Sequence, residues 1–233
     1  VGGELKLPIV RFETLNPIIN DSRDVYYLNH LIYEGLVRLD DQYRAQSALA
    51  KSWRWSASEK QWIFDLREDV KWHDGSMFSA SDVKFTIDVL KSSIGKVNES
   101  IYSQYVRHIT NVEIINDNKV AIGLDNIENN SIEIFTFPII PSNSYKNIKD
   151  VYEKETKLPA GTGPYKLQKY DRNNLIQLVP NSMYWGKQPN ITSILFEIIP
   201  DEDAALTLLE ANEISGAQTG ILEVMPHALV HDV

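Results

Sequence analysis

The stretch over residues 50–90 constrains the fold most strongly, because it combines two short strands, a turn and a helix in a fixed order. Apolar side chains recur at every second position over residues 62–66, which is the period of a strand with one buried face. Two tryptophans repeat this pattern just upstream. Asp74-Gly75 is a turn pair, since glycine takes positive φ at little steric cost. A β unit that ends in a tight turn is therefore predicted here.

A helix is predicted directly after that turn. Ser79 is a favourable N-cap residue, and Asp82 three positions later places a carboxylate at the positive end of the helix. Val83, Ile87 and Leu90 then follow at the spacing of one helix face. The sequence thus defines both the start of this helix and its apolar face.

Four further regions have the patterns of strands. Residues 5–10 form a short apolar run that predicts a strand. Hairpins are predicted around residues 116–118 and over residues 165–180, where polar turn residues separate alternating apolar runs. Residues 194–199 are almost continuously apolar, and this predicts a strand that is buried on both faces.

Two further helices are predicted. Residues 25–36 carry apolar side chains at helical spacing, and Gly35 near their end either allows close packing or ends the helix. A second helix is predicted to open at residues 201–203, because acids in a first turn suit the helix dipole.

Composition excludes several classes of protein. The chain has 233 residues, enough for one large domain or two small ones, and 43% of them are hydrophobic. A net charge of −9 argues against nucleic acid as a partner and against polybasic binding to a membrane surface. Cysteine is absent, so disulfides and a thiol nucleophile are excluded. No apolar run approaches the roughly 18–20 residues that cross a membrane.

No arrangement of reactive side chains predicts catalysis. The five histidines form no His-Glu-x-x-His motif, and the Gly-x-Ser-x-Gly elbow of a serine nucleophile is absent. The loop over residues 161–165 resembles a phosphate-binding loop only superficially, because it lacks the later glycine and the Gly-Lys-Ser/Thr ending. Acids are abundant, but an acid–base pair needs a set separation and opposed environments. The chain is therefore predicted to be no enzyme and to use no metal or cofactor.

A family resemblance rests on five short motifs at fixed spacing: Ala50-Lys51-Ser52-Trp53, Trp55-Ser56, Trp62-x-Phe64-x-Leu66-Arg67, Val70-Lys71-Trp72-His73-Asp74-Gly75 and Phe78-Ser79-Ala80-Ser81-Asp82-Val83. In this order they resemble the signature of the family 5 extracellular solute-binding proteins. These are the oligopeptide-, dipeptide- and nickel-binding receptors of bacterial ABC importers. Further matches are Leu15-Asn16-Pro17, Tyr33-Glu34-Gly35-Leu36-Val37, Gly161-Thr162-Gly163-Pro164-Tyr165 and Asn181-x-x-Tyr184-Trp185-Gly186.

One departure from the family pattern is Ser215, since relatives usually have Glu-Ile-Asp where this chain has Glu213-Ile214-Ser215. The resemblance fades after Ile221. Members of the family are much longer than this chain, so we expect it to be truncated and to match only the N-terminal half of the family architecture.

The resemblance implies an α/β fold of the periplasmic-binding-protein type II, with a mixed-sheet lobe and an inserted β-rich subdomain. Residues 1–41 and 159–233 are expected to form the two parts of lobe I. Residues 42–158 are expected to form the inserted subdomain, and the second lobe is expected to be absent.

The resemblance also implies where ligand contacts lie. In the family, the loop after residues 15–17 lines the ligand cleft, although a solvated polar turn is at least as good an interpretation here. A tyrosine near residues 102–105 contacts ligand in oligopeptide-binding relatives, and half-buried packing aromatics are the alternative. The loop over residues 218–220 also faces the cleft in relatives. The candidate ligand-binding residues are therefore Asp21, Ser22, Tyr102, Tyr105, Thr219 and Gly220.

The implied function is that of the extracytoplasmic solute-binding component of an ABC importer, which holds a peptide or other small solute non-covalently between two lobes. Its expected partners are the permease subunits of the transporter. It is expected to be periplasmic or a cell-surface lipoprotein, attached by a lipid anchor outside this chain. The alternative is a truncated or repurposed scaffold that binds another protein and no small solute, because a single lobe leaves a ligand half exposed.

Overall fold

The computed structural model describes residues 3–92, 100–125, 131–153, 158–201 and 203–204. These residues form two four-stranded sheets and one two-stranded sheet, with helices between the larger two. The elements, in chain order, are β1 (Glu4–Val10), α1 (Arg23–Ile32), β2 (Val37–Leu39), β3 (Ala45–Ser47), β4 (Ala50–Ser56), β5 (Gln61–Leu66), α2 (Ala80–Lys91), α4 (Ser103–Val106), β6 (Ile109–Asn116), β7 (Lys119–Leu124), η2 (Ile132–Thr136), η3 (Ser142–Ser144), α5 (Ile148–Val151), β8 (Tyr165–Asp171), β9 (Leu175–Pro180) and β10 (Ser193–Ile199).

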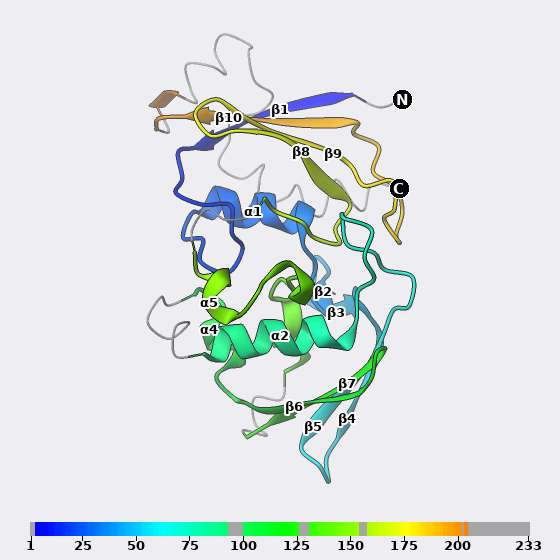
Figure 1. Cartoon of the computed structure of the whole chain (residues 1–233). Coiled ribbons are helices and arrows are strands. Elements are labelled where there is room, and N and C mark those ends of the chain that lie inside the picture. The colour runs from blue at the N-terminus through cyan, green and yellow to red at the C-terminus, as the bar shows by residue number, and fades with distance from the viewer. Residues whose placement is uncertain (1–2, 93–99, 126–130, 154–157, 202, 205–233) are drawn as a thin grey trace.

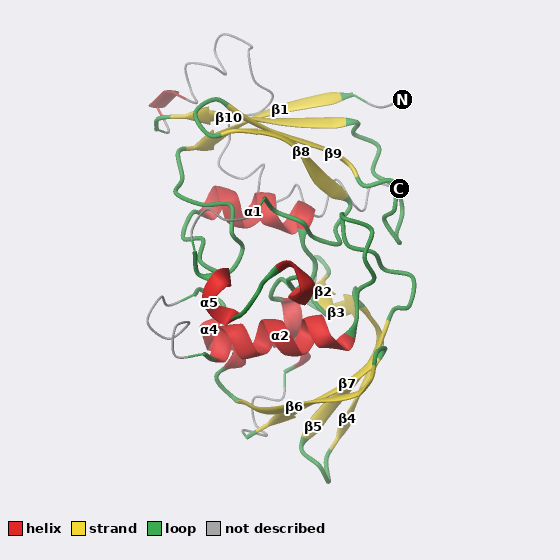
Figure 2. Ribbon diagram, in the orientation of Figure 1, coloured by secondary structure: helices red, strands yellow, loops and turns green. Residues whose placement is uncertain are grey.

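The elements stack in layers (Figure 1). One sheet, in the order β1-β10-β9-β8, lies at the top of the view with α1 beneath it. The other, in the order β4-β5-β7-β6, lies at the bottom with α2 above it. Figure 2 shows that the helices are gathered between these two sheets. In the described part of the chain, no helix is long and apolar enough to cross a membrane.

In the upper sheet, the first strand of the described chain pairs with the last one. β1 runs parallel to β10, with Leu7 opposite Phe196, whereas β9 is antiparallel to both of its neighbours. The predicted strand at residues 5–10 and the predicted hairpin over residues 165–180 are confirmed. The predicted division into lobe I and an inserted subdomain stays a prediction, and its first boundary falls in the turn between β2 and β3.

The prediction for residues 194–199 was right about the strand and wrong about its burial. Ile194 and Phe196 are fully buried, but Glu197 between the buried positions is exposed. The two strands beside β10 run in opposite directions, so β10 belongs to a mixed sheet. A strand of such a sheet can leave one face uncovered, whereas the strands of a purely parallel sheet are covered on both faces.

The lower sheet is antiparallel throughout and contains the tryptophan-rich stretch. Phe64 and Leu66 of β5 are fully buried, and Trp55 packs edge-on against Trp62 with ring centroids 5.4 Å apart. The predicted hairpin at residues 116–118 is confirmed as the turn between β6 and β7. The predicted apolar face is buried at Phe64 and Leu66, whereas Trp62 is half-buried and Ile63 on the other face is also buried.

The start of α2 agrees with the sequence prediction. The backbone N–H of Ser79 donates to Asp82 Oδ2 over 2.9 Å, so the acid three residues later caps the helix. Asp82 is also buried, and it accepts hydrogen bonds from the N–H and the hydroxyl of Ser142 at 2.8 and 2.7 Å. The same carboxylate therefore starts the helix and fixes a loop sixty positions later.

α1 begins two residues earlier and ends four residues earlier than predicted. Ser22 starts it as the N-cap, because its hydroxyl accepts from Val25 N over 3.4 Å. At the other end, the N–H of Gly163 donates to the carbonyl of Ile32 over 2.8 Å and replaces the next helical bond. Gly35 does not end the helix. A Cβ at Gly35 would lie 2.8 Å from the backbone of Thr136, so close packing is the correct one of the two interpretations.

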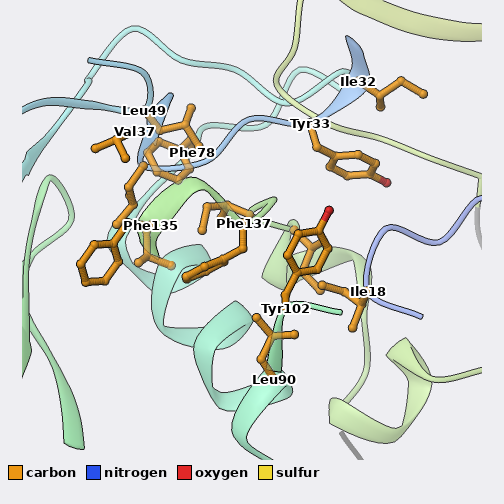
Figure 3. Close-up of a cluster of buried hydrophobic side chains, with 14 of the residues drawn as sticks. Ile18, Ile32, Tyr33, Val37, Leu49, Phe78, Leu90, Tyr102, Phe135 and Phe137 are labelled. Atoms are coloured by element: carbon orange, nitrogen blue, oxygen red, sulfur yellow. The ribbon is translucent and has the colours of Figure 1, made fainter. Parts of the chain in front are cut away.

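One contiguous core links the two sheets through the helices. Figure 3 shows Phe135, Phe137 and Phe78 packed around α2, with Tyr33 and Tyr102 on the side of the core toward Ile18. Phe135 contacts Phe64 of the lower sheet edge-on, with centroids 4.9 Å apart. Because the core is shared, the two sheets are held in a fixed relation by apolar packing.

Candidate ligand-binding site

A cavity of about 280 Å³ lies where the chain passes between the two sheets. Tyr26, Asn29 and His30 reach it from α1, Arg38 from β2, and Tyr105 from α4. The segment after η2 and the chain that leads into β8 complete its walls. Its volume approaches the ~300–1,000 Å³ of small-molecule sites in proteins, so the cavity is large enough for one end of a small solute.

Tyrosines form one wall of the cavity. Tyr26 stacks on Tyr102 at 6.3 Å between centroids, and Tyr102 lies 6.2 Å from Tyr105. Figure 3 shows the hydroxyl end of Tyr102 directed toward the ring of Tyr33. Burial raises the pKa of Tyr102 and that of Tyr26, and the neighbouring tyrosines add to this. These hydroxyls therefore stay protonated and can donate or accept hydrogen bonds without carrying charge.

The predicted ligand residues are only partly brought together. Tyr102 and Tyr105 line the cavity, and Tyr102 is 4% exposed, so it also packs in the core as the alternative interpretation proposed. Asp21 and Ser22 are not among the described residues that line the cavity, and Ser22 caps α1 instead. Thr219 and Gly220 lie outside the described residues. The binding role of all six positions stays a prediction.

Among the lining residues that sequence reasoning missed are Tyr26, Asn29, His30, Glu34 and Arg38. Glu34 belongs to a motif that the resemblance had marked, but without a role. Asn29 and His30 are polar residues of α1, and the prediction of this helix used only its apolar residues. The sequence offers no local signal that the polar side of α1 faces a cavity, because the opposite wall comes from residues about 75 positions later.

Glu34 is a half-buried carboxylate with three donors. Its Oε1 accepts from the hydroxyl of Tyr184 over 3.1 Å, and its Oε2 accepts from Thr162 Oγ1 and Trp185 Nε1 over 2.9 and 3.0 Å. Burial raises the pKa of Glu34, whereas the three hydrogen bonds and the charge of Arg38 oppose this rise. The residue therefore ties the end of α1 to two later segments at the base of the cavity.

His73 links the turn at residues 73–75 to the segment of Gly161 and Gly163. The N–H of Gly161 donates to Nδ1 over 3.2 Å, so Nδ1 carries no proton, and Nε2–H donates to the carbonyl of Gly163 over 3.1 Å. Burial lowers the pKa of His73 to about 4, and the charge of Lys166 adds to this, while the bond to Gly163 opposes it. The imidazole is therefore neutral near pH 7 and serves as a structural bridge.

We expect the free energy of unfolding to decrease as the pH is lowered from 6.5 toward 4, because the unfolded chain protonates His73 more readily than the folded one. This contribution is fully present above the unfolded pKa and is lost as the pH falls to the folded one. With a pKa of about 4 in place of 6.5, its full size is about 3 kcal/mol. In His73→Asn, which keeps an acceptor for Gly161 N–H, urea titrations should give a flatter pH dependence. Equal pH dependence in both proteins would rule out this assignment.

The side chains around the cavity are of kinds that can hold a small solute. Its lining offers hydroxyls, an amide, a guanidinium, an imidazole, a carboxylate and aromatic faces. In the described part of the chain, no three or more His, Asp or Glu side chains are arranged to hold a metal ion. The groups that are present can orient a solute through hydrogen bonds and ring contacts, which is how most small-molecule sites achieve specificity.

The fold is that of the type II periplasmic binding proteins. The crystal structure of NikZ from Campylobacter jejuni in complex with Ni(L-His) matches it with a TM-score of 0.78 and 27% sequence identity, over 91% of this chain and 42% of that chain. The chain belongs to the bacterial extracellular solute-binding proteins, family 5, because the model of the middle region of that family matches residues 44–226.

Two relatives agree with this family assignment. The nickel-binding periplasmic protein of Escherichia coli (strain K12) is 27% identical over 204 residues, covering 86% of this chain and 38% of that protein. The dipeptide-binding protein of the same organism is 30% identical over 204 residues, covering 79% of this chain and 37% of that protein. The chain therefore spans about two-fifths of the length of the relatives it matches.

Proposed function

We propose that the chain is part of the solute-binding component of an ABC importer and that it holds peptides non-covalently at the tyrosine-walled cavity. The observation that carries the proposal is the convergence of Tyr26 with Tyr102 and Tyr105 at one cavity, from segments far apart in the sequence. Tyrosine supplies a large apolar face and a hydrogen-bonding tip in one side chain. A wall of this kind suits main-chain peptide groups joined to varied side chains.

Family membership supports the rest of the proposal. The family consists of extracellular solute-binding proteins, and a dipeptide-binding protein is among the relatives. On this basis the protein acts outside the cytoplasm as a periplasmic protein or a lipid-anchored one, delivers its solute to permease subunits, and catalyses no reaction. Residues 1–41 and 159–233 form lobe I in this proposal, and residues 42–158 are inserted into it.

The test is isothermal titration calorimetry of the intact gene product with a randomised tripeptide pool. We expect saturable heat, and we expect Tyr105→Ala to weaken the binding about tenfold, because ring contacts of this kind contribute about 0.5–1.5 kcal/mol beyond area burial. Tyr43→Ala is the matched control, since Tyr43 is 79% exposed and lies away from the cavity. If the pool gives no heat and another protein is captured instead, the scaffold alternative is correct.

A further inference from the structure

Two tyrosines keep accessible surface in the lining of the cavity. Tyr26 and Tyr105 both line it and are half-buried, so part of each side chain can be touched by a solute. Tyr33 and Tyr102 line the same cavity but are 5% and 4% exposed, so they support the wall and offer a solute little surface. The aromatic surface that a solute meets is therefore provided chiefly by Tyr26 and Tyr105.

Ring-to-ring packing holds these two tyrosines in place. Tyr26 stacks on Tyr102 at 6.3 Å and meets the edge of Tyr27 at 5.4 Å between centroids. Tyr105 lies 6.2 Å from Tyr102, with the two rings tilted by 40°. All three separations fall in the range of about 4.5–7 Å that aromatic pairs prefer. The wall is thus ordered before a solute arrives, and this lowers the entropy cost of binding a further ring.

The other half-buried groups around the cavity also suit a neutral ring. The imidazole of His30 packs 4.3 Å from the ring of Tyr26, and its Nδ1–H donates to the carbonyl of Tyr26 over 2.8 Å. Among the described lining residues, Glu34 is the one acid and Arg38 the one permanently charged cation. An ionised side chain of either sign would meet a like charge here, whereas the π face of a neutral ring attracts a guanidinium.

The volume of the cavity limits what can enter. At about 280 Å³ it lies just below the range of whole small-molecule sites, so it holds one side chain and not an entire peptide. We infer that the cavity is a specificity pocket that selects solutes carrying an aromatic side chain. This inference rests on the proposed function and narrows its substrate class to peptides with such a residue at one position.

The experiment is calorimetry on the intact gene product with tripeptide pools in which one position is fixed and the other two are randomised. The fixed residue is phenylalanine or cyclohexylalanine, and each of the three positions is tested in turn. Cyclohexylalanine keeps the size of the ring, lacks its π system and is the more apolar of the two, so burial alone cannot favour phenylalanine. At one position we expect phenylalanine to bind about three- to tenfold more tightly, which matches the contribution of aromatic pairs beyond area burial.

A substitution assigns this preference to the tyrosine wall. Tyr105→Leu keeps an apolar side chain without a ring, and we expect it to bring the ratio between the two pools close to 1. Tyr43→Leu is the matched control and should leave the ratio unchanged, because Tyr43 is 79% exposed and is not among the described residues that line the cavity.

The outcomes separate this inference from the function on which it rests. Equal binding of the two pools at all three positions by the unsubstituted protein would overturn the inference and leave peptide binding intact, whether or not Tyr105→Leu folds. A preference for phenylalanine that persists in folded Tyr105→Leu would place the ring elsewhere, which also overturns it. Tighter binding of pools with lysine or aspartate at the fixed position would overturn it as well. Absence of heat with every pool would refute the proposed function and the inference together.

Discussion

Gly161→Ala is expected to destabilise the protein by about 4 kcal/mol or more, because overpacking against rigid backbone is among the few causes of so large a change. A methyl group at position 161 would overlap the carbonyl oxygen of Ile32 at the end of α1. Relief would require the chain to move away from α1 and would break the bonds that Gly161 makes with His73. Thermal unfolding should show a decrease in Tm of roughly 10 °C.

Substitutions at two other glycines serve as comparisons for Gly161→Ala. Gly163→Ala should also be strongly destabilising, since its Cβ would lie 2.6 Å from the carbonyl oxygen of Leu31. Gly3→Ala is the matched control, because a Cβ there meets nothing within 4 Å, and its effect should stay within about 0.5 kcal/mol. If Gly161→Ala unfolds within about 1 kcal/mol of the unsubstituted protein, the close contact between this segment and α1 does not exist.

The same contact links stability to binding. α1 carries Tyr26 and Asn29 into the cavity, and its end is fixed by Gly161 and Gly163 rather than by a local stop signal. Any variant that displaces the end of α1 also displaces one wall of the cavity. The glycines of this segment therefore matter because they lack a side chain, which lets the segment pack against the end of α1.

Local signals predicted the local structure well. The cap of α2 needs only Ser79 and Asp82, and both lie within one turn. The hairpins at residues 116–118 and 165–180 likewise depend on neighbours in the sequence. In contrast, the end of α1 is set by Gly163, some 130 positions later, and periodicity within α1 contains no information about that distant residue. The prediction therefore extended the helix too far.

The candidate site was predicted less well for the same reason. Tyr102 and Tyr105 were found through the family resemblance, and their place beside Tyr26 depends on the packing of α4 against α2 and η2. The side chains of Asn29 and Arg38 have buried polar atoms without a hydrogen-bond partner among the described residues. A sequence does not reveal which polar groups are buried in this way. Contacts between residues far apart in the sequence therefore form the site, whereas local sequence patterns determine the helices and strands.

Glu34→Ala is expected to destabilise the protein by about 4 kcal/mol, because three donors lose the acceptor that they share, and each unsatisfied group costs about 1–3 kcal/mol. Thr162 and Tyr184 can turn their hydroxyls toward other partners, but the indole N–H of Trp185 can only donate. The ring of Trp185 is also held under the guanidinium of Arg67, 3.8 Å from its centroid, so the indole cannot easily turn away. Urea unfolding measured near pH 7 would check this value.

Glu34→Gln is the matched control and should be at least as stable as the unsubstituted protein near pH 7. Its amide oxygen can accept from Trp185 and Thr162, while its amide N–H can donate to the hydroxyl of Tyr184. Burial raises the pKa of Glu34 in the folded protein, so the part of the stability that depends on protonation of Glu34 is present at low pH and is lost as the pH rises through that pKa. The advantage of Glu34→Gln should therefore grow from about pH 4.5 upward. If Gln is as harmful as Ala at neutral pH, the negative charge itself stabilises the junction, and the three hydrogen bonds do not account for the role of Glu34.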